Sequence, residues 1–272
     1  MTPPASAVDL HSEYPLADSD IEEFRQKGFV HLEGVLSPDA ISSYSDDITS
    51  VVEENNHLAL VPFDDRDTYD KAFIQITNLW RLSSRVETFV FSKRLAKVAT
   101  ELLGVSGVRM YHDQALYKEA GGGLTPWHAD QYYWPLVSNL TCTAWIPLQD
   151  TSIEMGPLAF SAGSHSVTTG RELEISHKSE ITLKEALSQL EEEERPFKLG
   201  DVSFHYGWTF HHTGPNSTDI PRNVMTIIYM DEQMRLKAPD NPNQQNDWDT
   251  WCPGAKVGEL IDTPINPVMF RR

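Results

Sequence analysis

Residues 126–134, which read PWHADQYYW, place an imidazole and a carboxylate two positions apart in an aromatic-rich segment. On an extended strand, side chains two positions apart point to the same side. His128 and Asp130 can therefore hold two adjacent positions on one metal ion. A second histidine from elsewhere in the chain would complete a set of two histidines and one carboxylate. Such a set leaves the remaining positions of Fe(II) open for a co-substrate and O2.

Residues 200–216 (GDVSFHYGWTFHHTGPN) form a strand-like segment that ends in a Gly-Pro turn and supplies candidate histidines. The segment contains His205, His211 and His212, and their number alone does not select one. Neighbouring residues on a strand face opposite sides, so His211 and His212 cannot both point at one metal.

The chain carries several motifs in a fixed order. They are His128-x-Asp130, then His211-x-Thr213-Gly214-Pro215-Asn216 and, eleven positions after His211, Arg222, with segments 143–148 (TAWIPL), 155–158 (MGPL) and 163–165 (GSH) between them. This order resembles the phytanoyl-CoA dioxygenase family of Fe(II)- and 2-oxoglutarate-dependent oxygenases. The resemblance covers roughly residues 20–232, and the combination is far more specific than any single motif. It implies that His211 is the third metal ligand and that Arg222 binds 2-oxoglutarate.

With His211 as the ligand, two histidines of the segment need other roles. His212 would face away from the metal and is expected to pack or to form a hydrogen bond. His205 lies six positions before His211, an even offset. It is expected to face the same side, near the substrate rather than the metal, if no bulge intervenes.

The resemblance also implies the cosubstrate contacts. The planar guanidinium of Arg222 matches the C5 carboxylate of 2-oxoglutarate, although a surface salt bridge is the alternative for this residue. Thr213 is expected to add a hydroxyl donor to the same carboxylate. Trp145 would line the cosubstrate pocket, or else be a core tryptophan. His112 occupies the position at which the family often has a glutamine that contacts 2-oxoglutarate, so this sequence departs from the pattern there.

The implied fold is mainly β: a double-stranded β-helix, or jelly roll, of two antiparallel sheets. Helices from the first hundred residues should pack on its outside. His128 and Asp130 are expected on one strand and His211 on a later one. We expect a flexible segment at residues 1–17 and a single Fe(II)/2-oxoglutarate dioxygenase-like domain at residues 18–272.

Local patterns predict further elements. Helices are expected at residues 21–28, 37–55, 92–103 and 181–194, and strands at residues 29–32, 108–118, 140–148 and 222–230. The strand at 108–118 should place His112, Gln114, Leu116 and Lys118 on one face. Glycines 121–123 indicate either a mobile lid or a plain surface loop. Trp248 and Trp251 of the tail are expected to pack onto the barrel.

The composition narrows the class of partner. A chain of 272 residues can bury a substantial core as one domain. Its net charge of −18 argues against nucleic acid and supplies no basic cradle for the phosphates of coenzyme A. Cys142 and Cys252 are too few for a disulfide framework. The sequence shows no signal peptide and no membrane span, which predicts a cytoplasmic protein.

The predicted reaction is decarboxylation of 2-oxoglutarate to succinate and CO2, coupled through Fe(II) and O2 to oxidation of an unactivated C–H bond. Related iron halogenases replace the carboxylate ligand with a small residue. Because this chain keeps Asp130, we expect hydroxylation, or a desaturation or cyclisation that branches from it. The aromatic residues of segment 126–134 indicate a small organic or lipid-like substrate.

Two other functions compete with this prediction. A jelly-roll module could bind a metal or small molecule without turnover, although such a module has no need of all four residues of the motif. A zinc hydrolase could use the same three ligands, but no evident general base lies beside them in the sequence.

Overall fold

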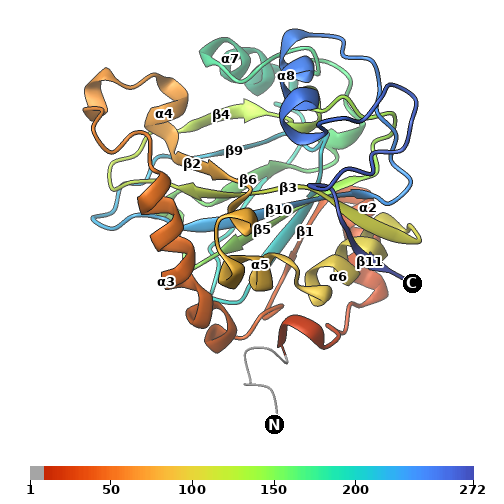
Figure 1. The fold of residues 1–272 in the computed structure, drawn as a ribbon. Coiled ribbons are helices and arrows are strands. Elements are labelled where there is room, and N and C mark those ends of the chain that lie inside the picture. The colour runs from red at the N-terminus through yellow and green to blue at the C-terminus, as the bar shows by residue number, and fades with distance from the viewer. Residues whose placement is uncertain (1–8) are drawn as a thin grey trace.

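A computed structural model describes residues 9–272 of the chain (Figure 1). The expected flexible segment at 1–17 lies partly outside the described residues, at positions 1–8. Its remaining part contacts the rest of the chain. Leu10 is fully buried, and its carbonyl accepts a hydrogen bond from Ser92 Oγ at 3.2 Å. Arg94 Nε donates to the carbonyl of Ser12 at 3.0 Å.

The protein is built on two antiparallel sheets, which confirms the predicted jelly roll. The larger sheet has seven strands in the order β1 (Phe29–Leu32), β8 (Val202–Tyr206), β5 (Thr141–Pro147), β10 (Val224–Asp231), β3 (Gly107–Tyr117) and β11 (Val268–Arg271), with β2 (Ile74–Thr77) also paired to β3. The smaller sheet has the order β4 (Thr125–His128), β9 (His211–Thr213), β6 (Leu158–Ser161) and β7 (Glu192–Glu194).

Two groups of helices surround the sheets (Figure 1). Helices α2 (Asp18–Lys27), α3 (Pro38–Asn55), α5 (Ser84–Val90) and α6 (Lys93–Leu103) contribute to one hydrophobic core with the outer face of the larger sheet, as predicted. Helices α4 (Thr68–Ala72), α7 (His177–Ala186) and α8 (Pro242–Trp251) lie at the opposite end of the sheets. Short 3-10 helices are η1 (Phe63–Asp65), η2 (Leu79–Arg81), η3 (Asp130–Tyr133), η4 (Ile153–Met155) and η5 (Ser164–Ser166).

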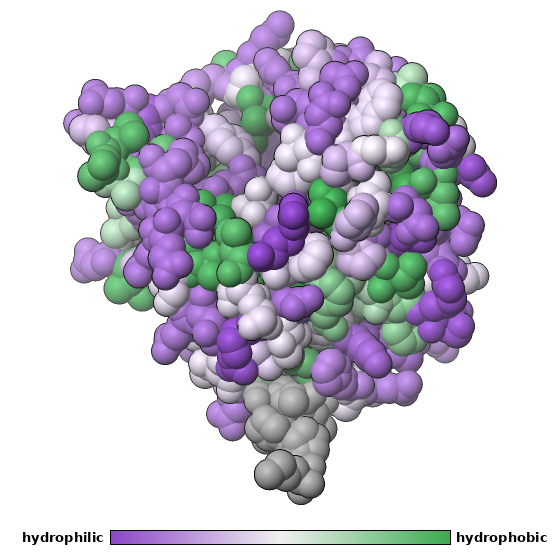
Figure 2. All heavy atoms as spheres, in the orientation of Figure 1, coloured by the Kyte–Doolittle hydropathy of each residue, from purple (hydrophilic) through white to green (hydrophobic). Residues whose placement is uncertain are grey.

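Strand alternation divides the larger sheet into a core face and a cavity face. In β5, Cys142, Ala144 and Ile146 pack against the helices, whereas Thr143 and Trp145 line the cavity between the sheets. The predicted face of β3 also points inward, since three of its four residues line the cavity: His112, Gln114 and Leu116. On the side of the molecule shown in Figure 2, hydrophilic residues cover most of the surface and hydrophobic residues form small separate groups.

The helix predicted at 181–194 is wrong in both bounds. Helix α7 begins at His177, because the Ser176 side chain accepts a hydrogen bond from the Ser179 amide, and it ends at Ala186. The acidic residues that followed in the predicted helix form strand β7, which pairs with β6 at the edge of the smaller sheet. A charged edge strand of this kind resists pairing with other chains.

Candidate active site

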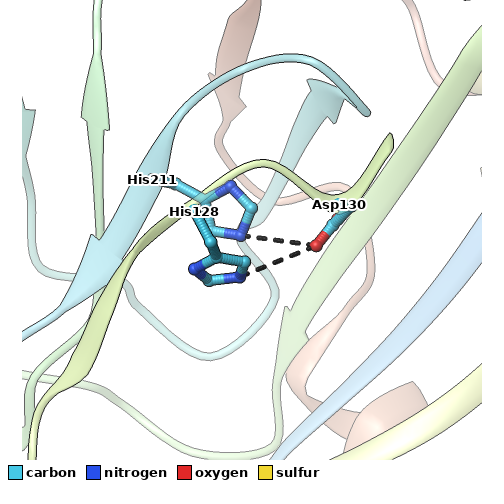
Figure 3. A group of neighbouring side chains, drawn as sticks. All are labelled: His128, Asp130 and His211. Carbon is cyan, nitrogen blue, oxygen red and sulfur yellow. Dashed lines mark ion pairs between the residues drawn. The ribbon is translucent and has the colours of Figure 1, made fainter. Parts of the chain in front are cut away.

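His128, Asp130 and His211 line one cavity, and their side chains come together as Figure 3 shows. His128 ends β4 and His211 begins β9, where the two residues are partners in the sheet register. One potential ligand atom from each of the three residues lies within 4.8 Å of the others. Asp130 Oδ1 is 3.7 Å from Nε2 of each histidine.

Asp130 does not share a strand with His128, contrary to our expectation. Strand β4 ends at His128, and Asp130 is the first residue of η3. The residue between them, Ala129, still has extended backbone angles of φ −127° and ψ 129°. The two-residue alternation therefore persists locally past the last ladder hydrogen bond, and the two side chains point the same way.

Main-chain carbonyls orient both histidines of the triad. Nδ1 of His128 lies 2.8 Å from the Pro126 carbonyl, and Nδ1 of His211 lies 2.9 Å from the Thr209 carbonyl. A carbonyl can only accept, so each Nδ1 carries the proton and each Nε2 has its lone pair free. A hydrogen bond from Nδ1 to a main-chain carbonyl is a usual way in which a metal-binding histidine is held in the correct tautomer.

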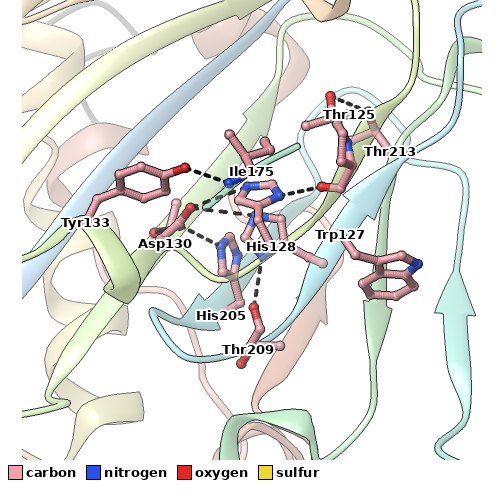
Figure 4. A network of polar contacts seen from close by, with 12 residues as sticks. Thr125, Trp127, His128, Asp130, Tyr133, Ile175, His205, Thr209 and Thr213 are labelled. Atoms are coloured by element: carbon pink, nitrogen blue, oxygen red, sulfur yellow. Dashed lines mark hydrogen bonds and ion pairs between the residues drawn. The ribbon is translucent and has the colours of Figure 1, made fainter. Parts of the chain in front are cut away.

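The second oxygen of Asp130 is held by neighbouring side chains. Thr143 Oγ1 donates to Asp130 Oδ2 at 3.2 Å, and His205 Nε2 lies 3.4 Å from the same oxygen. Figure 4 shows His205 and His128 both directed toward Asp130. Oδ1 is thereby left to face the two histidines of the triad.

His205 lines the same cavity as His211, as predicted, and its ring also contacts the Asp130 carboxylate. Strand parity is not the reason, because His205 belongs to β8 of the larger sheet and His211 to β9 of the smaller one. His212 behaves as predicted: its ring stacks on Trp127 with centroids 4.1 Å apart, and Nε2 lies 3.0 Å from Glu192 Oε1.

The electrostatics of the triad suit metal binding. Burial raises the pKa of the Asp130 carboxyl, but His211, His205 and His128 outweigh this effect and hold it below its ordinary value. Burial lowers the pKa of both His128 and His211. At neutral pH the site therefore presents one carboxylate and two neutral imidazoles, which are the protonation states that coordinate a metal.

Arg222 is a fully buried cation on the wall of the same cavity. Its backbone forms a bridge with Lys118 just before β10. One guanidinium nitrogen donates to the Gly156 carbonyl, and Nε has no hydrogen-bond partner among residues 9–272. Burial lowers the pKa of Arg222 to about 9, because no carboxylate neutralises it. Such an uncompensated cation is a natural partner for an anionic ligand.

The other predicted cofactor contacts also line the cavity. The Thr213 hydroxyl donates to Thr125 Oγ1 at 2.9 Å, and the Arg222 guanidinium lies 5.5 Å from the Trp145 ring centre. The His112 ring stacks on Trp251 with centroids 4.5 Å apart. Burial lowers the pKa of His112 to about 4, so it is neutral at pH 7. The structure brings Thr213, Trp145 and His112 into one cavity with the triad.

The cavity has a volume of about 470 Å³, within the range of small-molecule sites. Of the aromatic segment, Tyr133 and Trp134 line it, whereas Trp127 faces His212. Sequence reasoning missed several lining residues that come from segments distant in the sequence: Tyr69, Phe73, Gln75, Glu174, Asn243, Asn246 and Asp247. Proline at the first turn and the Asn241 cap indicate a helix at α8, but no sequence signal placed that helix over the cavity.

The triple glycine at 121–123 packs against its surroundings. The Gly121 amide donates to the Asn216 carbonyl and the Gly123 amide to the Lys71 carbonyl, at 2.9 and 2.8 Å. The buried Lys118 amine donates to the carbonyls of Gly123 and Gly214. These contacts join the glycine loop to the chain that follows His211. In this structure the loop therefore packs against the segment that positions His211.

Gly156 is required by close packing against the chain that follows His211. It adopts φ +66°, and a Cβ added there would lie 2.3 Å from the Gly214 carbonyl oxygen. Gly156→Ala is expected to lower the free energy of unfolding by more than about 1 kcal/mol and to weaken 2-oxoglutarate binding, because the Gly156 carbonyl also accepts from Arg222. Thermal unfolding and ligand titration would measure both effects. Gly254→Ala, also at positive φ but with nothing within 4 Å, is the control, and equal losses in the two variants would contradict the packing argument.

A jelly roll that brings two imidazoles, one carboxylate and a buried guanidinium to one cavity defines the class of Fe(II)- and 2-oxoglutarate-dependent dioxygenases. The comparisons with known proteins narrow the class. The model of the phytanoyl-CoA dioxygenase family (PhyH) matches residues 24–224, and the chain belongs to this family.

Curated relatives and solved structures agree with this assignment. The probable alpha-ketoglutarate-dependent hypophosphite dioxygenase of Stutzerimonas stutzeri is 25% identical over 223 residues, which are 76% of each chain. The phytanoyl-CoA dioxygenase domain-containing protein 1 of Danio rerio is 22% identical and covers 83% of this chain and 94% of its own. The structure of the epimerase SnoN with Fe3+, alpha ketoglutarate and nogalamycin RO superposes with a TM-score of 0.77 at 22% identity, over 93% of this chain and 98% of that one.

The protein is therefore an enzyme, a dioxygenase that uses Fe(II) as its metal and 2-oxoglutarate and O2 as co-substrates. None of the helices in the described part of the chain is long and apolar enough to cross a membrane.

Proposed function

We propose that His128, Asp130 and His211 hold the catalytic Fe(II), with Nε2 of each histidine and Oδ1 of the aspartate as ligands. One observation carries the proposal: these three atoms lie within 4.8 Å of one another, on the lining of a cavity that also contains the buried, unneutralised Arg222. The donor set fits Fe(II), which accepts imidazole and carboxylate together. When bound, Fe(II) supplies oxidative decarboxylation of 2-oxoglutarate to succinate and CO2, with oxidation of the substrate by the remaining oxygen.

In the proposed site, Arg222 binds the C5 carboxylate of 2-oxoglutarate through its planar fork. The Nε–H group has no partner among the described residues and is available for this purpose. Thr213 contributes its hydroxyl at the same wall, and Trp145 and His112 bound the cosubstrate on its two sides. Neutral His112 can accept or donate one hydrogen bond in the place where the family often has glutamine.

The proposed reaction is hydroxylation of an unactivated C–H bond in a small organic substrate, or a related oxidation of that bond. The cavity volume of about 470 Å³ supports a small molecule. The presence of a carboxylate at position 130 favours hydroxylation over halogenation. A cytoplasmic location and a single domain over residues 18–272 remain predictions from the sequence.

The test is succinate formation from 2-oxoglutarate by protein loaded anaerobically with Fe(II) and then exposed to air. Turnover that stops when O2 is withheld supports the oxygenase and excludes the zinc hydrolase. Turnover that proceeds equally well without O2 contradicts the proposal. Tight Fe(II) binding without succinate formation, whichever candidate substrate is added, would instead favour the non-catalytic binding module.

Thr143 is expected to position the metal ligand. Thr143→Val keeps the shape of the side chain but removes the hydrogen bond to Asp130 Oδ2, so Fe(II) affinity and turnover should fall by about 10- to 100-fold. Fe(II) titration by calorimetry measures the first quantity and succinate assays the second. Thr226→Val, on the same cavity wall but without a hydrogen bond to the triad, is the matched control. Equal Fe(II) affinity in wild type and Thr143→Val would remove Thr143 from this role.

A further inference from the structure

We propose that the outer part of the cavity binds a small molecule that carries an ammonium group beside an apolar surface. The inference rests on the proposed function, because Fe(II) and 2-oxoglutarate then fill the inner part of the cavity and leave the outer part for the substrate. Four side chains carry the argument: the carboxylates of Asp247 and Glu174 and the aromatic rings of Tyr133 and Trp251.

The charges around the cavity are unbalanced once the inner part is filled. Apart from histidines, its ionisable acids and bases are Asp130, Arg222, Glu174 and Asp247, together with tyrosines. In the proposed function, Asp130 is a metal ligand and Arg222 is neutralised by the cosubstrate. The two acidic or basic groups that remain for the substrate are both carboxyl groups. An anionic substrate would face them without any free lysine or arginine among the described lining residues.

Of the two carboxylates, Asp247 is the better candidate for a contact with the ammonium group. It lies on α8 and is only 8% exposed, yet it belongs to no ion pair with a described residue. The Tyr111 hydroxyl donates to its Oδ2 at 3.2 Å, which is a neutral contact. Burial raises the pKa of the Asp247 carboxyl to about 7, so its charge is destabilised in the free protein. A bound ammonium group would supply the missing counter-charge.

Glu174 places a second carboxylate at the mouth of the cavity. It is exposed and precedes α7, and its Oε2 accepts a hydrogen bond from Asn243 of α8 at 3.1 Å. This contact joins the segment before α7 to α8, and both residues line the cavity. Helices α7 and α8 lie at the same end of the molecule in Figure 1. A negatively charged mouth attracts cations and repels anions such as the phosphates of coenzyme A.

Aromatic rings line the same cavity as these carboxylates and the metal triad. Trp251 lies over His112, and the Tyr133 hydroxyl accepts the Ile175 amide at 2.9 Å, which fixes the tyrosine ring at the cavity. Tyr69 and Phe73 also line the cavity and lie against each other with ring centroids 4.8 Å apart. Aromatic faces bind both ammonium groups and apolar skeletons, whereas they offer little to an isolated phosphate.

A matched set of three probes tests the charge preference. The probes are 2-phenylethylamine, 2-phenylethanol and 3-phenylpropanoate, which share an aryl skeleton and differ in charge. Binding is measured anaerobically by calorimetry on protein saturated with Mn(II) and 2-oxoglutarate, so that Arg222 is already occupied. The amine is expected to bind at least about tenfold more tightly than either other probe.

Variants assign the preference to the two carboxylates. The double change Asp247→Asn and Glu174→Gln is expected to weaken amine binding by about tenfold or more and to leave the alcohol unchanged. Asp249→Asn, an exposed carboxylate on the same helix but outside the cavity lining, should have no effect. Equal or tighter binding of the alcohol or carboxylate, no binding of the amine, or an unchanged preference in the double variant would overturn the inference.

The same calorimeter separates this inference from the proposed function. Absence of Mn(II) or 2-oxoglutarate binding would refute the proposed cofactor site. The three probes would then be titrated into metal-free protein. Tighter binding of the amine that depends on Asp247 would still support a cationic ligand, and the absence of this preference would still overturn the inference. Normal cofactor binding without an amine preference would refute the substrate class alone.

Discussion

Asp130→Ala is expected to lower succinate formation from 2-oxoglutarate by more than about 100-fold. Loss of a partner that only orients a ligand already costs about 10- to 100-fold, and here the ligand itself is removed. The variant removes the carboxylate oxygen that lies 3.7 Å from Nε2 of both histidines. Fe(II) affinity, measured by anaerobic titration, should fall together with turnover.

Asp201→Ala provides the comparison for structural damage. Asp201 is a buried carboxylate that accepts hydrogen bonds from the amides of Gly34 and Lys198, away from the cavity lining. Its removal should lower the free energy of unfolding but leave Fe(II) affinity unchanged. If Asp130→Ala retained wild-type Fe(II) affinity and turnover, the assignment of the carboxylate ligand would be wrong.

Arg222→Met should raise the KM for 2-oxoglutarate at least about 30-fold, which corresponds to about 2 kcal/mol of lost binding free energy. The buried guanidinium has no anionic partner among residues 9–272, so we expect the cosubstrate carboxylate to neutralise its charge. For the same reason, the free energy of unfolding of the cofactor-free variant should be equal to or higher than that of wild type. Burial, and then the charge of Arg222, lower the pKa of the neighbouring Lys118 to about 6, and the variant relieves this repulsion.

Arg222→Lys separates charge from geometry. A lysine keeps a positive charge but lacks the planar fork, so its KM for 2-oxoglutarate should lie between those of wild type and Arg222→Met. Steady-state assays with varied 2-oxoglutarate and thermal unfolding without it provide the two readouts. A large loss of stability with an unchanged KM in Arg222→Met would show that the arginine is structural.

The sequence alone was sufficient for the family, the jelly roll and the residues of the candidate metal site, because the order and spacing of several motifs together resemble the phytanoyl-CoA dioxygenase family. Local periodicity added the faces on which strand side chains lie, since it needs no tertiary information. The alternation in segment 140–148 correctly separates Thr143 and Trp145 from the core residues between them. The spacing of His128 and Asp130 survives even though the strand ends between them, because Ala129 stays extended.

Only the tertiary structure decided which distant side chains surround the ligands. His205 and Asp130 are separated by 75 positions and belong to different elements, so no strand parity relates them. Asp247 likewise reaches Tyr111 across 136 positions, through the packing of α8 over the cavity. Sequence periodicity determines the face of an element on which a residue lies. The face that it meets depends on how sheets and helices pack, and this packing brings Glu174 and Asp247 to the cavity that the triad lines.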